Sequence, residues 1–123
     1  MSRKKILLVD DSETVRMMER IILGKAAYEV VVAADGIEAV EQAKAEKPDL
    51  ILMDLVMPRL DGFGATKAIR EDPTTRDIPI VMVTTKSEAA RVEEAMRLGC
   101  RDYTTKPIHG PDLLAKVRAL IGE

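Results

Sequence analysis

The segment LILMDLVMPRLDG, residues 50–62, places an acidic residue directly after four apolar ones. An unbroken apolar run of this kind is typical of a strand that is covered on both faces, as in a parallel sheet. Asp54 follows at the end of this strand, and an isolated ionised carboxylate is very costly in an apolar interior. The Asp54 carboxylate must therefore be solvated, paired, bound to a metal ion or used in a reaction.

Similar apolar runs recur along the chain and predict further buried strands. They are ILLV, VVVAA and IVMV, at residues 6–9, 30–34 and 80–83, and a weaker strand is expected near CRDYT, residues 100–104. Strand and helix patterns repeat five times without a linker, which predicts one α/β domain over residues 1–123. Right-handed crossovers would place helices on both faces of a single parallel sheet.

The segments between the strands have the length and the apolar spacing of helices. In the first of them, Val15, Met18, Ile21 and Ile22 share the face that is expected to pack on the sheet, and Gly24 offers a stop. The later helices are expected near residues 37–43, 61–71, 92–99 and 113–121.

The composition argues against several classes of protein. Twenty-one acidic residues against 19 basic ones give a net charge of −2, so no global field would attract nucleic acid or an anionic membrane. Cys100 is the single cysteine, so no internal disulfide is possible and a reducing cytoplasm is the expected location. The basic start MSRKK precedes only four apolar residues, too few for a signal peptide, and no run has the length of a transmembrane helix.

Polar side chains follow the predicted strands, all at one edge of the sheet. Asp10 and Asp11 follow the first strand, Asp54 the third, Thr84 the fourth and Lys106 the weak fifth. In such sheets ligands bind beyond the carboxyl ends of the strands. Three carboxylates this close repel one another, and a hard divalent cation such as Mg²⁺ relieves the repulsion. A hydroxyl and an ammonium group beside them are suited to the outer oxygens of a phosphoryl group.

Four segments together resemble the motifs of the receiver domains of bacterial two-component response regulators. LLVDDS, LILMDLVMPRLDG, VMVTT and DYTTKPI match these motifs in order and in spacing. The chain is similar along its whole length to the single-domain members of the chemotaxis type. The resemblance implies a doubly wound (βα)5 flavodoxin-like fold, with a five-stranded parallel sheet in the order 2-1-3-4-5.

The resemblance also implies phosphorelay signalling and a role for each acidic residue. Asp54 corresponds to the aspartate that receives a phosphoryl group from a histidine kinase or a histidine phosphotransfer protein. Asp10 and Asp11 correspond to the acidic pair that organises Mg²⁺. In the family the metal ion is also held by the acceptor aspartate and by a main-chain carbonyl, which here belongs to Val56.

Further residues correspond to those that hold the phosphoryl group and respond to it. Thr84 and Lys106 match the gripping residues, and Tyr103 matches the aromatic residue that switches. Such a domain catalyses its own phosphorylation and dephosphorylation and does not turn over an external substrate. The surface formed by residues 92–99, 100–104 and 113–121 would then be read by a downstream target protein.

Three positions depart from the family pattern or lie where the family varies. Thr85 is bulkier than the alanine often found there and would narrow the path to the phosphoryl group. Val56 and Lys86 flank the site at positions that help to set the rate of phosphoryl hydrolysis. Because the apolar Val56 cannot position a water molecule by hydrogen bonding, it favours a longer-lived phosphorylated form.

Other interpretations stay open at this point. Asp10 and Asp11 are also suited to capping the helix that follows them, and Lys106 alone resembles an ordinary solvated charge. A haloacid-dehalogenase-like phosphatase would need a second carboxylate two residues after Asp54, where the chain has Val56. A flavodoxin-like cofactor binder would need a glycine- and hydroxyl-rich loop where the chain has DDSET. A degenerate receiver that binds partners without phosphorylation is the main alternative, although no acid, hydroxyl or lysine of the motif is missing.

Overall fold

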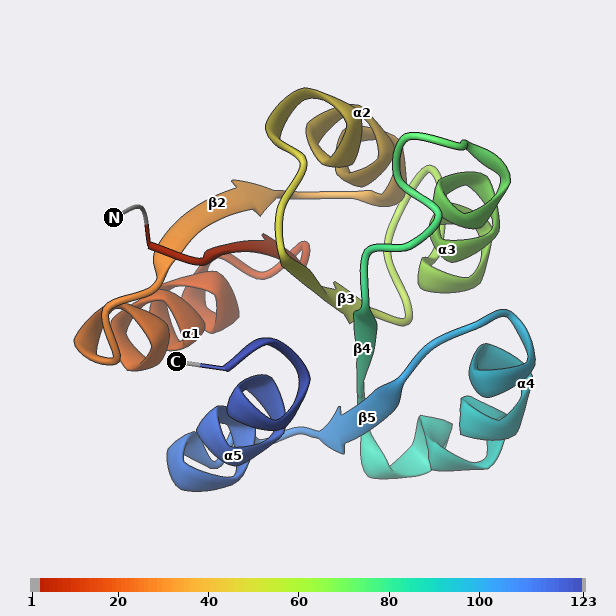
Figure 1. The fold of residues 1–123 in the computed structure, drawn as a ribbon. Helices are drawn as coiled ribbons and strands as arrows, with labels where there is room; N and C mark the ends of the chain where they lie inside the picture. Colours follow the sequence, from red (N-terminus) through yellow and green to blue (C-terminus); the bar gives the residue numbers. More distant parts are fainter. Residues whose placement is uncertain (1–2, 123) are drawn as a thin grey trace.

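The computed structural model describes residues 3–122, apart from the side chains of residues 86, 87 and 89. Within these residues five strands alternate with helices along the chain (Figure 1). The strands are β1 (Lys5–Val9), β2 (Glu29–Ala33), β3 (Leu50–Asp54), β4 (Ile80–Thr84) and β5 (Asp102–Thr105). The helices are α1 (Glu13–Lys25), α2 (Gly36–Glu46), α3 (Gly62–Glu71), α4 (Val92–Arg97) and α5 (Gly110–Ile121), and a 3₁₀ helix, η1 (Lys86–Arg91), precedes α4.

The strands form one parallel sheet in the order β2-β1-β3-β4-β5, which confirms the predicted fold class and strand order. The register places Leu8 of β1 between Val32 of β2 and Leu52 of β3. The strand order reverses between β1 and β3, because the chain adds β2 on one side of this pair and β4 on the other. Residues that follow β1 and β3 therefore meet at the switch point, where ligands bind in sheets of this kind.

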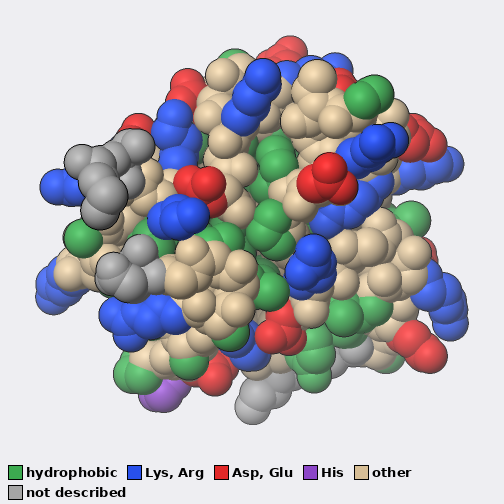
Figure 2. Space-filling view, in the orientation of Figure 1, with side chains coloured by type: hydrophobic (Ala, Val, Ile, Leu, Met, Phe, Trp, Pro, Cys, Tyr) green, Lys and Arg blue, Asp and Glu red, His purple; other side chains and the backbone are tan. Residues whose placement is uncertain are grey.

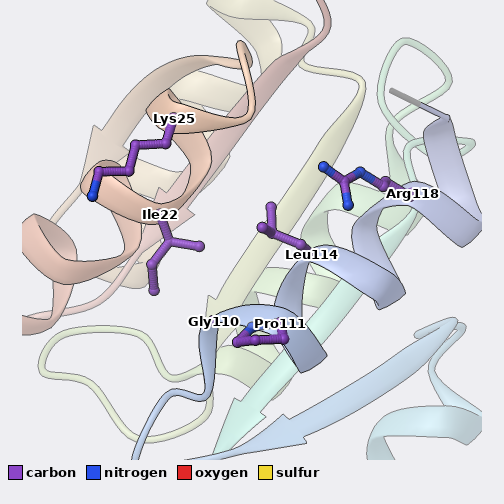
Figure 3. A pocket seen from close by; sticks show the side chains of 6 residues that line it. All are labelled: Ile22, Lys25, Gly110, Pro111, Leu114 and Arg118. Atoms are coloured by element: carbon purple, nitrogen blue, oxygen red, sulfur yellow. The ribbon is translucent and has the colours of Figure 1, made fainter.

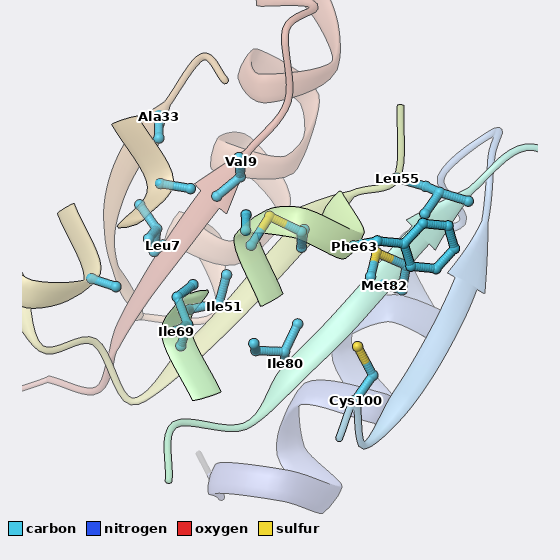
Figure 4. Packing of buried hydrophobic residues seen from close by; sticks show 14 of the residues in the cluster. Leu7, Val9, Ala33, Ile51, Leu55, Phe63, Ile69, Ile80, Met82 and Cys100 are labelled. Carbon is cyan, nitrogen blue, oxygen red and sulfur yellow. The ribbon is translucent and has the colours of Figure 1, made fainter. Parts of the chain in front are cut away.

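The helices cover the two faces of the sheet in two groups (Figure 1). On one face α2, α3 and α4 pack over a cluster of apolar side chains, in which Ile69 of α3 lies beside Ile51 of β3 and Phe63 lies beside Leu55 and Met82 (Figure 4). On the other face α1 and α5 contribute Leu23 and Leu113 to a second cluster. The sheet is thus the middle layer of three.

Burial of the strands depends on their place in the sheet. Every residue of β3 and β4 is buried, and β1 is buried except at its first residue, as their apolar runs predicted. Strand β2 is covered on both faces as predicted, with Val31 against one cluster and Val30 and Val32 against the other, but it is only partly buried because it forms one edge of the sheet. Strand β5 forms the opposite edge, which explains its weak apolar pattern.

Helix α1 packs on only part of the face that its sequence pattern predicted, because Val15 and Ile22 are partly buried but two other residues of that face are exposed. Met18 and Ile21 are 42% and 53% exposed, although both were expected against the sheet. The fully buried side chains of α1 are instead those of Glu19 and Leu23, which lie four residues apart and so share one face. The helix has apolar residues on more than one face, and packing against its neighbours decides which face is covered.

Charged side chains of both signs are interspersed over the face of the molecule seen in Figure 2, in agreement with the small net charge. Within residues 3–122 no helix combines the length and the apolar character that a membrane crossing requires.

Gly62, at the start of α3, lies in close contact with the end of β3. A Cβ atom at this position would lie 2.4 Å from the main-chain oxygen of Asp54 and 3.0 Å from Cα of Leu55. The Gly62 N–H also donates a hydrogen bond of 2.8 Å to the Leu55 carbonyl. The absence of a side chain therefore allows α3 to support the backbone of Asp54 directly.

Replacing Gly62 with alanine should destabilise the protein by about 1–3 kcal/mol, the usual cost when overpacking forces the backbone to shift. Gly24→Ala is the matched control, because α1 runs past Gly24 to Lys25 instead of stopping as predicted, and a Cβ atom there meets no atom beyond its own helix within 4 Å. The control should stabilise the protein by about 0.5–1 kcal/mol. Urea denaturation measures both, and equal stability of the two variants would argue against the contact at Gly62.

Candidate functional site

The predicted site residues lie at the carboxyl ends of the strands. Asp10 follows β1, Asp54 is the last residue of β3, Thr84 is the last residue of β4, and Lys106 follows β5. Their backbones are fixed by the sheet ladder: the Asp10 N–H donates to the Ala33 carbonyl, and the Lys106 N–H donates to the Thr84 carbonyl at 2.6 Å. The parallel sheet thus brings four segments, distant in the sequence, to one edge.

Two buried carboxylates share one ammonium group at the centre of this edge. Lys106 Nζ lies 3.1 Å from Asp10 Oδ2 and 3.3 Å from Asp54 Oδ1. Asp10 is 1% exposed and Asp54 is 4% exposed, so water does little to solvate either charge. The interpretation of Lys106 as a solvated surface charge is therefore wrong, because its ammonium group is paired with both acids.

A third carboxylate completes an acidic cluster. Carboxylate oxygens of Asp10, Asp11 and Asp54 all lie within 4.8 Å of one another, and Asp11 is the exposed member of the three. Asp10 Oδ2 forms the ion pair with Lys106 but makes no well-directed hydrogen bond. A set of close, under-satisfied carboxylate oxygens beside solvent fits a hard divalent cation such as Mg²⁺.

Burial and the neighbouring charges shift the pKa values of Asp54 and Lys106. Burial and the neighbouring Asp10 charge raise the pKa of Asp54 to about 7, and the Lys106 charge opposes this rise. Burial lowers the pKa of Lys106, but its close pairing with Asp10 and the charge of Asp54 outweigh burial and raise the pKa overall. Without a bound cation, the Asp54 carboxyl therefore holds a proton more firmly than an ordinary aspartic acid.

Thr84 has a buried hydroxyl at the end of β4. The residue is 0% exposed, and Oγ1 has no hydrogen-bond partner within the described part of the chain. The neighbouring Thr85 is partly buried, and its N–H donates to Glu88 Oε1 at 2.9 Å. The Lys86 side chain, predicted to flank the site, lies outside the described residues. A buried donor without a partner is costly, which suggests that Thr84 is satisfied in a liganded state.

Val56 and Tyr103 lie nearer the solvent. Val56 follows Asp54 by two residues in the loop after β3, and 52% of it is exposed. Tyr103, on the edge strand β5, is 40% exposed. Lys116 Nζ donates a hydrogen bond of 2.7 Å to the Tyr103 carbonyl and lies 5.6 Å from the centroid of the ring. The ring of Tyr103 is therefore on the outside of the sheet in this structure.

The structure also bears on the helix-capping interpretation of the first acidic pair. Ser12 is the N-cap of α1, and its hydroxyl accepts a hydrogen bond from the Val15 N–H. Asp10 Oδ1 accepts a hydrogen bond of 2.9 Å from the Ser12 N–H, which orients the carboxylate. Capping therefore does not account for Asp10 and Asp11.

Sequence reasoning missed Glu19, a fourth acidic residue that acts on this site. Its side chain is 1% exposed, and Oε2 has no hydrogen-bond partner among the described residues. Burial and the Asp10 charge raise the pKa of Glu19 to about 8, and the Lys106 charge opposes the rise. The available signal was an acidic residue four positions before Leu23, inside a helix that was predicted to be amphipathic.

An open groove of about 410 Å³ lies elsewhere, between α1 and α5 (Figure 3). Ile22 and Leu114 give it apolar walls, and Lys25 and Arg118 carry positive charge beside it. None of the residues that line the groove belongs to the acidic cluster, so the size of this groove says nothing about the chemistry of the carboxylates.

Residues 6–118 match the family described as the response regulator receiver domain. This match covers most of the chain, which therefore belongs to the receiver domains of two-component response regulators, as its motifs predicted.

Individual relatives support this assignment. The chain is 41% identical over 117 residues to protein PilH of Pseudomonas aeruginosa, an alignment that covers 95% of the chain and 97% of PilH. It is 39% identical to the alkaline phosphatase synthesis transcriptional regulatory protein PhoP of Bacillus subtilis, with 96% of the chain and 48% of that protein covered. It spans about half the length of that relative and of several others.

Solved structures give the same result. The chain superimposes on the chemotaxis protein CheY4 of Vibrio cholerae with a TM-score of 0.90, at 34% identity and with 97% of this chain and 99% of the other covered. It also superimposes, with a TM-score of 0.90 and 34% identity, on the receiver domain of the sensor histidine kinase PA1611 of Pseudomonas aeruginosa. That alignment covers 99% of this chain and 100% of the other, whose active site cleft contains a coordinated magnesium ion.

Without metal ions, the free energy of unfolding should fall as the pH rises from about 4 to about 8. The folded protein keeps a proton on Glu19, with its pKa raised from 4.5 to about 8, and on Asp54, with its pKa raised from 3.8 to about 7. The unfolded chain releases both protons earlier, so the stability present at low pH is lost as the pH passes through the raised values. A tenfold difference in proton affinity between the folded and unfolded states corresponds to about 1.4 kcal/mol of stability.

Urea melts across this pH range in the presence of a chelator measure the effect. The Glu19→Gln variant should show a shallower slope, because only Asp54 then contributes. A stability that is constant or rises with pH would contradict the raised pKa values.

Proposed function

We propose that the chain receives a phosphoryl group on Asp54 and passes the signal on through a change in its surface. The observation that carries this proposal is the buried Asp54 carboxylate, which faces one ammonium group and two further carboxylates at the sheet edge. A site with this balance lacks positive charge, and transfer of a phosphoryl group needs positive charge around its outer oxygens.

The residues present fit one divalent ion, and the proposed cofactor is Mg²⁺. The carboxylates of Asp10, Asp11 and Asp54 and the main-chain carbonyl of Val56 would hold it. Bound there, Mg²⁺ would neutralise the acidic cluster and polarise the oxygens of the incoming phosphoryl group. Asp11, as the exposed member of the cluster, lies where an ion would enter.

In the proposed reaction a carboxylate oxygen of Asp54 attacks the phosphorus atom of the donor. An oxygen–phosphorus bond to Asp54 forms, while the bond from phosphorus to the donor nitrogen breaks and its electron pair stays on the donor. Lys106 and the Thr84 hydroxyl would stabilise the charge on the outer oxygens of the phosphoryl group. Water later hydrolyses the acyl phosphate, so the protein catalyses its own modification and is not a turnover enzyme.

The phosphoryl group would also supply the free energy for the switch. Reversal of a population from 1:99 to 99:1 needs about 5.5 kcal/mol of differential binding. A hydrogen bond to a charged group contributes about 1.5–3 kcal/mol, and an ion pair at about 4 Å gives up to about 4 kcal/mol at an effective dielectric constant of 20. Because Lys106 already pairs with two acids, it contributes only the difference in free energy between its ion pair with the phosphoryl group and its present ion pairs. Thr84 and Lys106 are therefore needed together.

The response would reach the surface through β4 and β5. Movement of Thr84 towards the phosphoryl group would free space behind it, and the exposed Tyr103 ring could turn inwards. The face formed by α4, β5 and α5 would then differ between the two states and be read by a target protein. The proposed phosphodonor is a histidine kinase or a histidine phosphotransfer protein in the cytoplasm, and neither nucleic acid nor a membrane is a proposed partner.

The degenerate receiver is less well supported, because the acids, the hydroxyl and the lysine are present and the acids and lysine meet in space. A small phosphodonor with Mg²⁺ should therefore add a single phosphoryl group to the wild type, as measured by mass spectrometry. Asp54→Asn should abolish the label, because the nucleophile is removed, and excess chelator should suppress it. Full labelling of the variant would falsify the assignment of Asp54.

Replacing Lys106 with alanine should leave phosphorylation possible but disconnect it from the surface response. In the wild type, phosphodonor should shift NMR signals from Asp54 through Thr84 to Tyr103 and α4. In the variant the shifts beyond Thr84 should shrink sharply, because one hydrogen bond from the hydroxyl provides less than the roughly 5.5 kcal/mol needed. Shifts of equal reach in both proteins would show that the response takes another route.

A further inference from the structure

The Glu19 carboxyl has no role in the proposed phosphoryl transfer, although it is buried close to the acidic site. It projects from α1 into the layer that α1 and α5 form on one face of the sheet. The side chain is 1% exposed, and Oε2 has no hydrogen-bond partner among residues 3–122. A buried polar atom without a partner is costly, so a partner in another state of the protein would explain why an acid occupies this position.

Lys106 is the cation placed to become that partner. It lies between β5 and α5, and α5 packs beside α1 on the same face of the sheet (Figure 1). Burial raises the pKa of Glu19 and the Lys106 charge opposes this rise, although the ammonium group pairs with Asp10 and Asp54 in this structure. The charges that act on Glu19 come from Asp10 after β1, Asp54 on β3 and Lys106 after β5.

The present partners of Lys106 are the residues proposed to hold the metal ion. Its Nζ lies 3.1 Å from Asp10 Oδ2 and 3.3 Å from Asp54 Oδ1. A divalent cation on these carboxylates would compete with the ammonium group for the same oxygens and repel it. Glu19 Oε2 then offers a buried acceptor that is not already in use.

We propose that Glu19 is a positioning residue whose carboxyl takes the Lys106 ammonium group while the site holds a metal ion but no phosphoryl group. This inference rests on the proposed function. A phosphoryl group on Asp54 must then draw Lys106 away from Glu19, which leaves the buried carboxyl unpaired again. Glu19 thus competes with the phosphoryl group for Lys106 and holds the protein in its unswitched state.

The test measures the affinity of the protein, saturated with Mg²⁺, for beryllofluoride, which imitates a phosphoryl group on aspartate. Glu19→Leu removes the competing acceptor and should tighten beryllofluoride binding by about tenfold, the scale of one hydrogen bond to a charged group. Glu19→Gln keeps an acceptor oxygen without the charge and should fall between the wild type and Glu19→Leu. Glu13→Gln, a loss of negative charge at an exposed position on the same helix, is the matched control and should bind as the wild type does.

Two further measurements separate positioning from a general effect on the fold. In a Lys106→Met background, Glu19→Leu should no longer change beryllofluoride affinity, because the group in competition is gone. The NMR signals of the Lys106 ammonium and its adjacent methylene in the Mg²⁺ state should shift in Glu19→Gln and not in Glu13→Gln. If Glu19→Leu fails to fold, Glu19→Gln is used to compare beryllofluoride affinity in both the wild-type and the Lys106→Met backgrounds.

Each outcome decides the question. Unchanged or weaker beryllofluoride binding by the Glu19 variants, or an equal gain in the Lys106→Met background, would overturn the inference and leave the proposed function intact. A wild type that binds Mg²⁺ but no beryllofluoride would overturn the proposed function itself. Tighter binding that depends on Lys106 would support both.

Discussion

The structure depends on the burial of two carboxylates around a single ammonium group. Asp10 and Asp54 are almost fully removed from water, and Lys106 lies within 3.3 Å of both. One positive charge cannot neutralise two negative ones, and the cost of burying the excess charge appears as the raised pKa of Asp54. The site is therefore most stable when a proton or a metal ion is added. This deficit of positive charge makes the site suited to a divalent cation, whose charge would in turn favour a phosphoryl group.

The fold holds these like charges together because their backbones cannot move apart. Strands β3 and β4 are buried along their whole length, and β1 and β3 are neighbours at the point where the strand order reverses. Gly62 allows the start of α3 to touch the backbone of Asp54 itself. Lys106 differs, because it follows the edge strand β5 and is anchored by one backbone hydrogen bond to Thr84. The acids thus belong to the rigid part of the sheet, and the ammonium group that links them to β5 is the part best placed to move.

Glu19 is a further buried carboxyl, and it lies on helix α1. The buried acid on α1 adds a third nearly inaccessible carboxyl, and burial together with the Asp10 charge raises its pKa to about 8. An apolar side chain at this position would pack without such a cost. The proposed exchange of Lys106 between Asp10, Asp54 and Glu19 gives the buried acid a function and ties α1 to the state of the site.

The sequence by itself determined the strands, the strand order through its family motifs, and the four strand ends that carry Asp10, Asp54, Thr84 and Lys106. Buried parallel strands have unbroken apolar runs, so the polar residues that follow them can be identified in the sequence. Only the tertiary structure decided that β2 is partly exposed, that Met18 and Ile21 face solvent, and that Glu19 is buried. The physical reason is that periodicity describes one element at a time. Burial of a side chain depends on the edge of the sheet and on the helix packed beside it, which no local pattern contains.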